Sequence, residues 1–229
     1  MYNKYIFINN NRRKKQKELE EKSKEENSQI TFEMLEKKNK KTERAKTVEK
    51  RSNRIDKKTL KFVDNYVLVD IETTGLSPVN DEIIEIGAIK VKDNKIVNEY
   101  NQLIKINRKL STFITNLTGI TDEMLKQGKL PNVVFKEFVD FLENDVIIGH
   151  NINFDYGFLS NKCKKYINYN LQNDCIDTMY LAKKLVPNST NYKLGTLANY
   201  FNVSYEGAHR GLKDVEITYE VYNHLRKLI

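Results

Sequence analysis

Apolar runs alternate with polar turns after residue 60, and the first of these runs predict strands. YVLVDI, residues 66–71, is typical of a buried strand, and the polar stretch SPVND, residues 77–81, indicates a turn. EIIEIGAIKV, residues 82–91, and KIVNEYNQLIKI, residues 95–106, then predict two more strands joined at Asp93 and Asn94. We expect these three strands to be antiparallel neighbours.

Apolar residues take helical spacing after Pro131. VVFKEFVDFLEN, residues 133–144, predicts a helix, and DVIIGHN, residues 145–151, predicts a short interior strand that runs into a loop. The remaining predicted elements are a helix at 154–167, a strand entering a helix at 175–186, and helices at 192–203 and 211–229. Antiparallel strands followed by alternating helices and strands predict an α/β domain with a mixed sheet.

The first 60 residues have a different texture. They contain neither glycine nor proline, and they hold 19 Lys and Arg against 10 Asp and Glu, whereas the whole chain has a net charge of +8. We expect a charged N-terminal extension that is partly helical or disordered. Its excess of basic residues suits binding to a nucleic-acid backbone, but a chain rich in lysine and asparagine throughout also produces such a segment without that role. Both interpretations stay open.

Cysteine usage and hydropathy bear on the compartment. Cys163 and Cys175 lack the spacing of a CxxC pair, which favours free thiols in a reducing compartment. The apolar stretch YIFIN, residues 5–9, is too short for a signal segment or a membrane span. We therefore expect a cytoplasmic protein with no membrane partner.

Two acids interrupt the first predicted strand. Asp70 and Glu72 are two residues apart, so their side chains project from one face of the strand, about 7 Å apart at the Cα atoms. Burying a carboxylate without a compensating charge lowers the stability of the fold by an amount on the order of several kcal/mol. A divalent ion such as Mg²⁺ or Mn²⁺ would compensate them. The alternative is that both acids lie solvated at the strand end.

Further acids follow at predicted element boundaries. Asp155 falls in the first turn of a helix that leaves an interior strand, and Asp214 falls near the start of the final helix, with His209 just before it. These positions can converge at one edge of the sheet. We expect a cup of four carboxylates, with His209 mobile at its rim. Taken alone, His209 would be interpreted as a capping or packing histidine.

Three segments carry a family resemblance. VDIETTGL, HNINFD and AHRGLKD resemble, in order, the three exonuclease motifs of the DEDDh family of 3′–5′ exonucleases. The similarity is greatest to proofreading exonuclease domains and subunits of bacterial replicative DNA polymerases. It implies a ribonuclease-H-like domain over residues 61–229, with a mixed five-stranded sheet flanked by helices and the charged extension over residues 1–60. Gly211 departs from the family pattern, which more often has alanine there.

The resemblance also implies roles for individual residues. Asp70, Glu72, Asp155 and Asp214 would hold two divalent metal ions, Mg²⁺ or Mn²⁺, and His209 would act as general base. The expected substrate-binding residues are Thr73, Thr74, Leu76, Thr118, Asn151 and Phe154. Thr118 replaces a histidine of some relatives, which puts its contact in doubt, and Leu76 and Phe154 also suit an ordinary core.

The expected activity is metal-dependent 3′–5′ hydrolysis of single-stranded or frayed DNA, releasing nucleoside monophosphates in proofreading or repair. The expected partner is a DNA 3′ end, with RNA possible, and a DNA polymerase or repair protein as a further partner. No C-terminal extension of the kind that docks a free-standing proofreading subunit follows Asp214, which weakens the expectation of a polymerase partner. The alternatives are an RNA or short-oligonucleotide exonuclease of the same fold and a non-catalytic protein that binds nucleic acid or serves as a docking platform.

Overall fold

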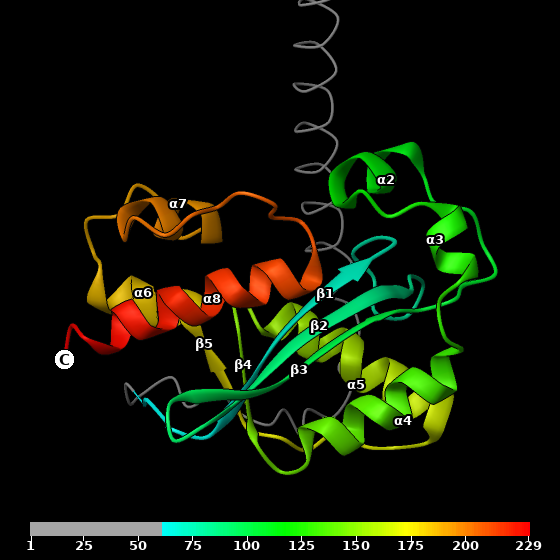
Figure 1. The fold of residues 1–229 in the computed structure, drawn as a ribbon, viewed down its shortest axis with the longest axis horizontal. Helices are drawn as coiled ribbons and strands as arrows, with labels where there is room; N and C mark the ends of the chain where they lie inside the picture. The colour runs from blue at the N-terminus through cyan, green and yellow to red at the C-terminus, as the bar shows by residue number, and fades with distance from the viewer. Residues whose placement is uncertain (1–60) are drawn as a thin grey trace, which may run out of the picture. The chain divides into compact units, whose positions relative to one another are not determined.

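Five strands form one mixed sheet in the computed structural model, which describes residues 61–229. The predicted extension of residues 1–60 lies outside the described residues. The strand order is β3-β2-β1-β4-β5 (Figure 1). The strands are β1 (Tyr66–Thr73), β2 (Ile83–Lys92), β3 (Lys95–Leu103), β4 (Val146–Gly149) and β5 (Cys175–Asp177).

The first three strands are antiparallel, as predicted, and β4 and β5 continue the sheet in parallel beside β1. Asp93 and Asn94 form the turn between β2 and β3, and both have positive φ angles, 49° and 60°. Hairpin turns of this kind require positive φ, which asparagine and aspartate tolerate better than other residues with a Cβ atom. The arrangement confirms the predicted α/β class with a five-stranded mixed sheet.

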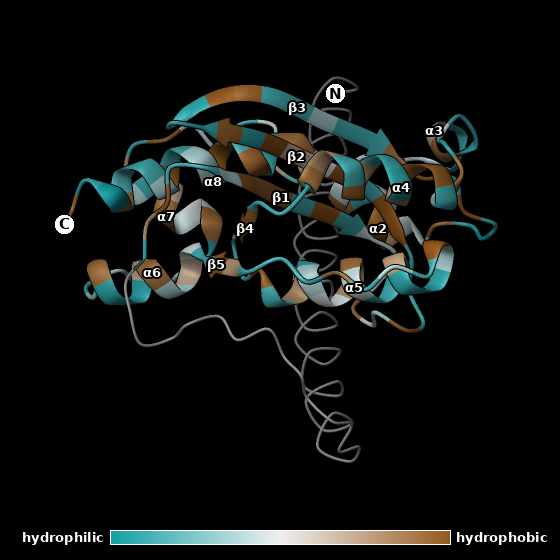
Figure 2. Cartoon of the chain, turned by 90° about the horizontal axis from the view of Figure 1, so that it is seen from below, coloured by the Kyte–Doolittle hydropathy of each residue, from teal (hydrophilic) through white to brown (hydrophobic). Residues whose placement is uncertain are grey.

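Helices cover both faces of the sheet (Figure 1). Against one face pack α4 (Pro131–Leu142) and α5 (Asn153–Ile167), and against the other pack α6 (Thr178–Leu185), α7 (Leu194–Tyr200) and α8 (Gly211–Arg226). Val67 and Val69 of β1 join the first core, while Tyr66 and Leu68 join the second. This explains why β1 begins as a continuous apolar run, and Figure 2 shows the hydrophobic residues concentrated on the strands between the helices.

Two short helices lie outside the sequence-based prediction. They are α2 (Thr112–Thr118) and α3 (Asp122–Lys126), which follow β3. Each begins at a side-chain cap: the Ser111 hydroxyl accepts a hydrogen bond from the Ile114 N–H, and the Thr121 hydroxyl accepts one from the Met124 N–H. Ile114, Ile120 and Leu125 pack with Ile84 in a third, smaller core. Local capping and this small core therefore hold α2 and α3 beside the start of β2.

Helix α8 begins in direct contact with the middle of the sheet. A Cβ atom on Gly87 would lie 2.1 Å from the Gly211 carbonyl carbon, and one on Gly211 would lie 2.9 Å from the Gly87 nitrogen. Gly87 is the β2 partner of Asp70 in the sheet register. The departure from alanine at position 211 thus has a packing reason, and the close approach places the first turn of α8 beside Asp70.

None of the helices within residues 61–229 combines the length and apolar character needed to cross a membrane.

Candidate active site

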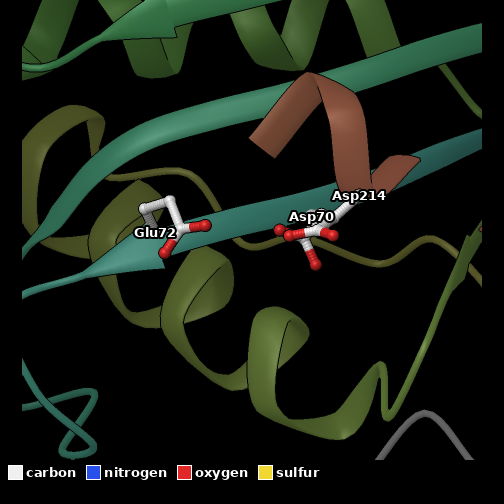
Figure 3. A group of neighbouring side chains, drawn as sticks. All are labelled: Asp70, Glu72 and Asp214. Carbon is white, nitrogen blue, oxygen red and sulfur yellow. The ribbon is translucent and has the colours of Figure 1, made fainter. Parts of the chain in front are cut away.

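Three of the predicted acids meet between β1 and α8. Asp70, Glu72 and Asp214 each offer a carboxylate oxygen, and these oxygens lie within 4.8 Å of one another. Figure 3 shows the Asp70 and Asp214 carboxylates side by side over β1, with Glu72 further along the strand. Asp214 reaches this position because α8 starts against Gly87. The spacing and the all-oxygen donor set suit a divalent cation.

Asp155 lies next to this group, on the first turn of α5. Its side chain is buried, and its Oδ1 accepts a hydrogen bond of 3.2 Å from the Ile71 N–H of β1. Ile71 stands between Asp70 and Glu72, so this bond fixes the Asp155 carboxylate beside the strand that carries the other two acids. The structure thus brings together all four acids predicted from the sequence.

The pKa values of the four carboxyl groups show how crowded they are. Burial, followed by the charges of Asp155 and the other acids, raises the pKa of Asp70 well above its usual range. Burial and the nearby Asp214 raise the pKa of Glu72 to about 8, and burial raises the pKa of Asp155 to about 8. The pKa of Asp214 is raised as well, chiefly by burial. Four acids with raised pKa values in one place call for a positive charge among them.

His209 stands at the edge of the acid group, directly before α8. Its side chain is exposed, and its backbone has a φ angle of 69°, in the left-handed region that residues other than glycine rarely adopt. Its backbone N–H donates a 2.9 Å hydrogen bond to Asp214 Oδ2. The imidazole meets the Tyr205 ring edge-on, with the ring centroids 6.2 Å apart. The backbone of His209 is therefore tied to an acid of the group, while its ring faces solvent.

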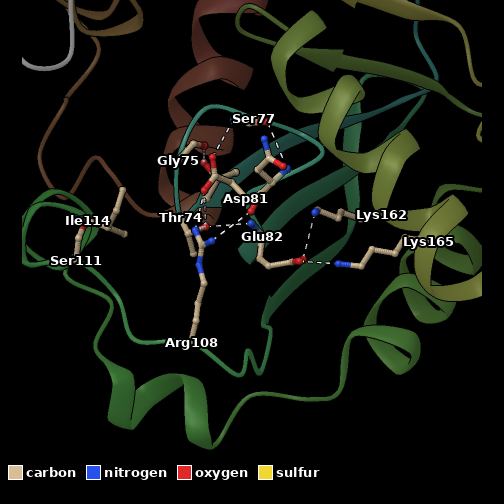
Figure 4. A network of polar contacts seen from close by, with 12 residues as sticks. Thr74, Gly75, Ser77, Asp81, Glu82, Arg108, Ser111, Ile114, Lys162 and Lys165 are labelled. Carbon is tan, nitrogen blue, oxygen red and sulfur yellow. Dashed lines mark hydrogen bonds and ion pairs between the residues drawn. The ribbon is translucent and has the colours of Figure 1, made fainter. Parts of the chain in front are cut away.

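The loop that follows β1 is organised around Asp81 (Figure 4). Asp81 Oδ2 accepts the Ser77 N–H at 3.0 Å, and Asp81 Oδ1 pairs with Arg108 at 2.7 Å. Arg108 also contacts the Thr74 hydroxyl, which accepts the Glu82 N–H. A Cβ atom on Gly75 would lie 2.4 Å from Asp81 Oδ2, so only glycine allows this carboxylate to sit under the loop.

Helix α5 holds the far end of the same loop through Glu82 (Figure 4). Lys165 donates to Glu82 Oε1 at 2.7 Å, and the buried Lys162 lies 3.3 Å from Glu82 Oε2. Burial alone would raise the pKa of Glu82, but these cations and the Tyr166 hydroxyl bring that pKa below its usual value. Since α5 also carries Asp155, the same helix positions both the loop and this acid.

Asp81→Asn is expected to weaken the contacts that hold the loop after β1, while the four acids of the candidate site keep their positions. The substitution removes the charge that Arg108 pairs with, which we expect to lower the free energy of unfolding by about 1 kcal/mol, because the pair is partly exposed. If the loop binds substrate, KM for a single-stranded oligonucleotide rises severalfold while kcat changes little. Asp140→Asn, on the exposed side of α4, serves as the matched control. A kcat loss as large as the KM change would contradict a role limited to binding.

The remaining predicted substrate contacts lie around the same region. Thr73 donates a 2.6 Å hydrogen bond to the Gly75 carbonyl, and Leu76 is half-buried in the loop. Phe154 is half-buried against Phe158, with ring centroids 5.0 Å apart. Asn151 is exposed with a φ angle of 65°, and its N–H donates to Asp177 Oδ1 at 3.0 Å. Their roles toward a substrate stay predictions.

Thr118 is placed differently from the other predicted contacts. It is 2% exposed at the end of α2. Its hydroxyl donates to the Ile114 carbonyl at 2.9 Å and accepts the Ile120 N–H at 3.1 Å. The side chain thus serves the helix end itself, and we leave Thr118 out of the proposed site.

Sequence reasoning missed Glu85 and Arg210. Glu85 is 1% exposed on β2, where it is the register partner of Glu72. Arg210 donates to both of its oxygens, from Nη2 at 2.8 Å and from Nε at 3.1 Å. The signal in the sequence was a glutamate inside the apolar run IIEIGAI, where a buried charge needs a partner from elsewhere in the chain.

Comparison with known proteins adds a family to this geometry. The Exonuclease family profile (RNase_T) matches residues 67–222. The DNA polymerase III PolC-type protein of Caldanaerobacter subterraneus subsp. tengcongensis is 42% identical over 157 residues, which is 69% of this chain and 11% of that protein. The PolC-type protein of Thermotoga petrophila is 43% identical over 157 residues, with the same two coverages. The matched region is thus a small part of these relatives.

Solved structures show the same fold. Escherichia coli exonuclease I in complex with a dT13 oligonucleotide superposes with a TM-score of 0.63 at 17% identity, over 72% of this chain and 41% of that one. Exonuclease X in complex with 5′ overhanging duplex DNA superposes with a TM-score of 0.59 at 24% identity, over 71% and 91%. These likenesses confirm the predicted ribonuclease-H-like fold. With the profile match across most of residues 61–229, they lead to one conclusion: the chain belongs to the Exonuclease family.

Proposed function

We propose that residues 61–229 form a metal-dependent 3′–5′ exonuclease that hydrolyses terminal phosphodiester bonds of single-stranded or frayed DNA and releases nucleoside monophosphates. The observation that carries this proposal is the group of four acids with raised pKa values beside the exposed imidazole of His209. A purely structural or docking domain has no use for four crowded carboxylates. Family membership agrees with nuclease chemistry, and the resemblance to proofreading exonucleases supplies the direction.

The acids fit divalent ions. Carboxylate oxygens of Asp70, Glu72 and Asp214 within 4.8 Å of one another match the hard, all-oxygen donor set that Mg²⁺ and Mn²⁺ prefer. Asp155, beside Asp70, extends the set, so that two ions would be held. When bound, such ions neutralise the charge of the phosphodiester and make water acidic enough to act as a nucleophile near neutral pH.

His209 is the proposed general base. Imidazole is a common general base in enzymes, and the exposed ring stands at the edge of the acid group, where it would reach a water molecule between the acids and the substrate. The hydrogen bond from the His209 N–H to Asp214 Oδ2 fixes the backbone from which the ring projects. In the proposed reaction the imidazole takes one proton from the attacking water while the water oxygen bonds to the terminal phosphorus. The bond between that phosphorus and the 3′-oxygen of the preceding nucleotide breaks, and this oxygen takes up a proton from solvent.

The loop after β1 is the proposed binding site for the terminal nucleotide. Thr73 and Thr74 would hold the terminal sugar, Leu76 would lie beside the last base, and Asn151 and Phe154 would line the opposite wall. Stacking and apolar contact contribute about 1–3 kcal/mol per base with little sequence preference. Such a pocket suits an enzyme that removes any of the four bases.

The PolC-type relatives suggest a setting in replication. Those proteins bear the name of a DNA polymerase, and this chain matches only 11% of their length. We propose proofreading or repair of DNA 3′ ends, next to a polymerase or repair protein in the cytoplasm, as the context of the activity.

The test is degradation of end-labelled oligonucleotides by the full chain. Single-stranded DNA and RNA of one sequence, labelled at the 5′ or the 3′ end, are incubated with Mg²⁺, Mn²⁺ or EDTA, and an Asp70→Asn preparation controls for contaminating nucleases. We expect a ladder from 5′-labelled DNA, immediate release of the label as a mononucleotide from 3′-labelled DNA, and no reaction in EDTA. Faster degradation of RNA than of DNA would identify RNA as the substrate. Inactivity with both metals would refute the nuclease proposal.

A further inference from the structure

Glu85 is a buried carboxylate next to the acid group, and it forms an ion pair with Arg210. It is 1% exposed on β2, opposite Glu72. Its Oε2 accepts hydrogen bonds from Arg210 Nε at 3.1 Å and from the Gly211 N–H at 3.0 Å, and its Oε1 accepts one from Arg210 Nη2 at 2.8 Å. Three donors thus converge on one carboxylate, and all three belong to two consecutive residues at the start of α8.

These bonds fix the chain on one side of His209. Arg210 directly follows His209, and the two hydrogen bonds from its planar guanidinium fix how that group lies on the Glu85 carboxylate. On the other side, Asp214 Oδ2 holds the His209 N–H at 2.9 Å. His209 between them keeps a φ angle of 69°, a conformation that is unfavourable for a residue other than glycine and persists only where the surrounding structure enforces it. The Glu85 contacts and the bond to Asp214 therefore hold the backbone on both sides of His209.

Stability alone is a poor reason for this ion pair. A buried ion pair is often no more stabilising than apolar residues of similar volume. Helix α8 is already anchored by Val215, Val221 and Leu225, which are fully buried in the core shared with β1 and α6. What the Glu85 contacts add is a fixed direction for the first turn of the helix.

We propose that Glu85 and Arg210 form a positioning clamp that sets the placement of His209 and Asp214 for the reaction. The inference rests on the proposed function, because it gives His209 and Asp214 their task. Neither clamp residue touches the substrate in this proposal. Arg210 and Glu85 act through the backbone of residues 209–214.

The test compares Arg210→Lys and Glu85→Gln with the unsubstituted chain. Lysine keeps the charge of Arg210 but loses the two-pronged contact, and glutamine keeps the size of Glu85 but loses its charge. Arg226→Lys is the matched control, since Arg226 pairs with Asp64 at 2.7 Å at the other end of the same helix. We expect kcat on single-stranded DNA to fall about 10- to 100-fold in both clamp variants, with KM within about twofold and the control unchanged.

Hydrogen exchange supplies a second readout that does not depend on activity. In Arg210→Lys we expect the amide of His209 to exchange about tenfold faster, because it is held only while the clamp keeps it on Asp214, and the amides of residues 221–225 to keep their protection. An unchanged kcat, or unchanged exchange at His209, would overturn the clamp. If the unsubstituted chain fails to degrade DNA, the proposed function falls, and the exchange experiment still decides whether the clamp holds His209.

Discussion

Asp155→Asn is expected to lower DNA hydrolysis by at least about 1,000-fold, because one missing carboxylate removes several kcal/mol of charge stabilisation from a site of this kind. Asparagine has nearly the same shape, and its side-chain oxygen can still accept the Ile71 N–H that Asp155 Oδ1 accepts at 3.2 Å. The fold should therefore survive. The loss should appear in kcat, measured with a single-stranded oligonucleotide in Mg²⁺.

Binding separates this outcome from a damaged protein. Fluorescence anisotropy with labelled single-stranded DNA should give nearly the same Kd for Asp155→Asn and for the unsubstituted chain, since the loop after β1 is untouched. Asp140→Asn, on the exposed side of α4, controls for the loss of one negative charge and should retain full activity. Activity of Asp155→Asn within tenfold of the unsubstituted chain would remove this residue from the metal site.

The acid group is expected to make the metal-free protein less stable at pH 8 than at pH 5. In the folded state the pKa values of Glu72 and Asp155 are raised to about 8, and those of Asp70 and Asp214 are raised too. Unfolded carboxyl groups titrate near pH 4. Between these limits the folded state holds more protons, so raising the pH lowers the free energy of unfolding. The group's contribution is fully present below about pH 4 and is lost as the pH passes 8.

Urea unfolding in EDTA at pH 5 and pH 8 measures this effect. Other carboxylates, such as Glu82, have lowered pKa values and act in the opposite direction, so the comparison must be with Glu72→Gln. We expect the fall in free energy of unfolding from pH 5 to pH 8 to be smaller in Glu72→Gln by about 2 kcal/mol or more. Added Mg²⁺ should stabilise the unsubstituted chain more at pH 8 than at pH 5. Identical pH dependence in both proteins would show that Glu72 titrates normally in the folded state.

The sheet and the large helices were predictable because their patterns are long and local. The apolar run of β1 and the helical spacing in α4 and α8 each extend over two or more turns or a full strand, and all three appear where the pattern predicts them. The short helices α2 and α3 were missed because their signal is only a cap, Ser111 or Thr121, followed by seven or five residues. Such a signal is also typical of a turn.

The acids of the candidate site could be predicted from the sequence, but the residues that hold the start of α8 in place could not. Asp70 and Glu72 interrupt an apolar strand, and the two motifs HNINFD and AHRGLKD contain Asp155, His209 and Asp214. Glu85 also interrupts an apolar strand, but its partner Arg210 lies 125 residues further along the chain, a pairing that a local pattern does not encode. The contact of Gly211 with Gly87 was also not predictable from a local pattern, because a single glycine does not indicate which segment of backbone packs against it.

The chain order of the acids has a consequence during protein synthesis. Of the described elements, α8 leaves the ribosome last, and it carries both Asp214 and the residues that follow His209. A nascent chain that has folded β1 to β5 holds Asp70, Glu72 and Asp155 but neither the fourth acid nor the base. On the proposed mechanism, unfinished or C-terminally truncated products would therefore not hydrolyse nucleic acid.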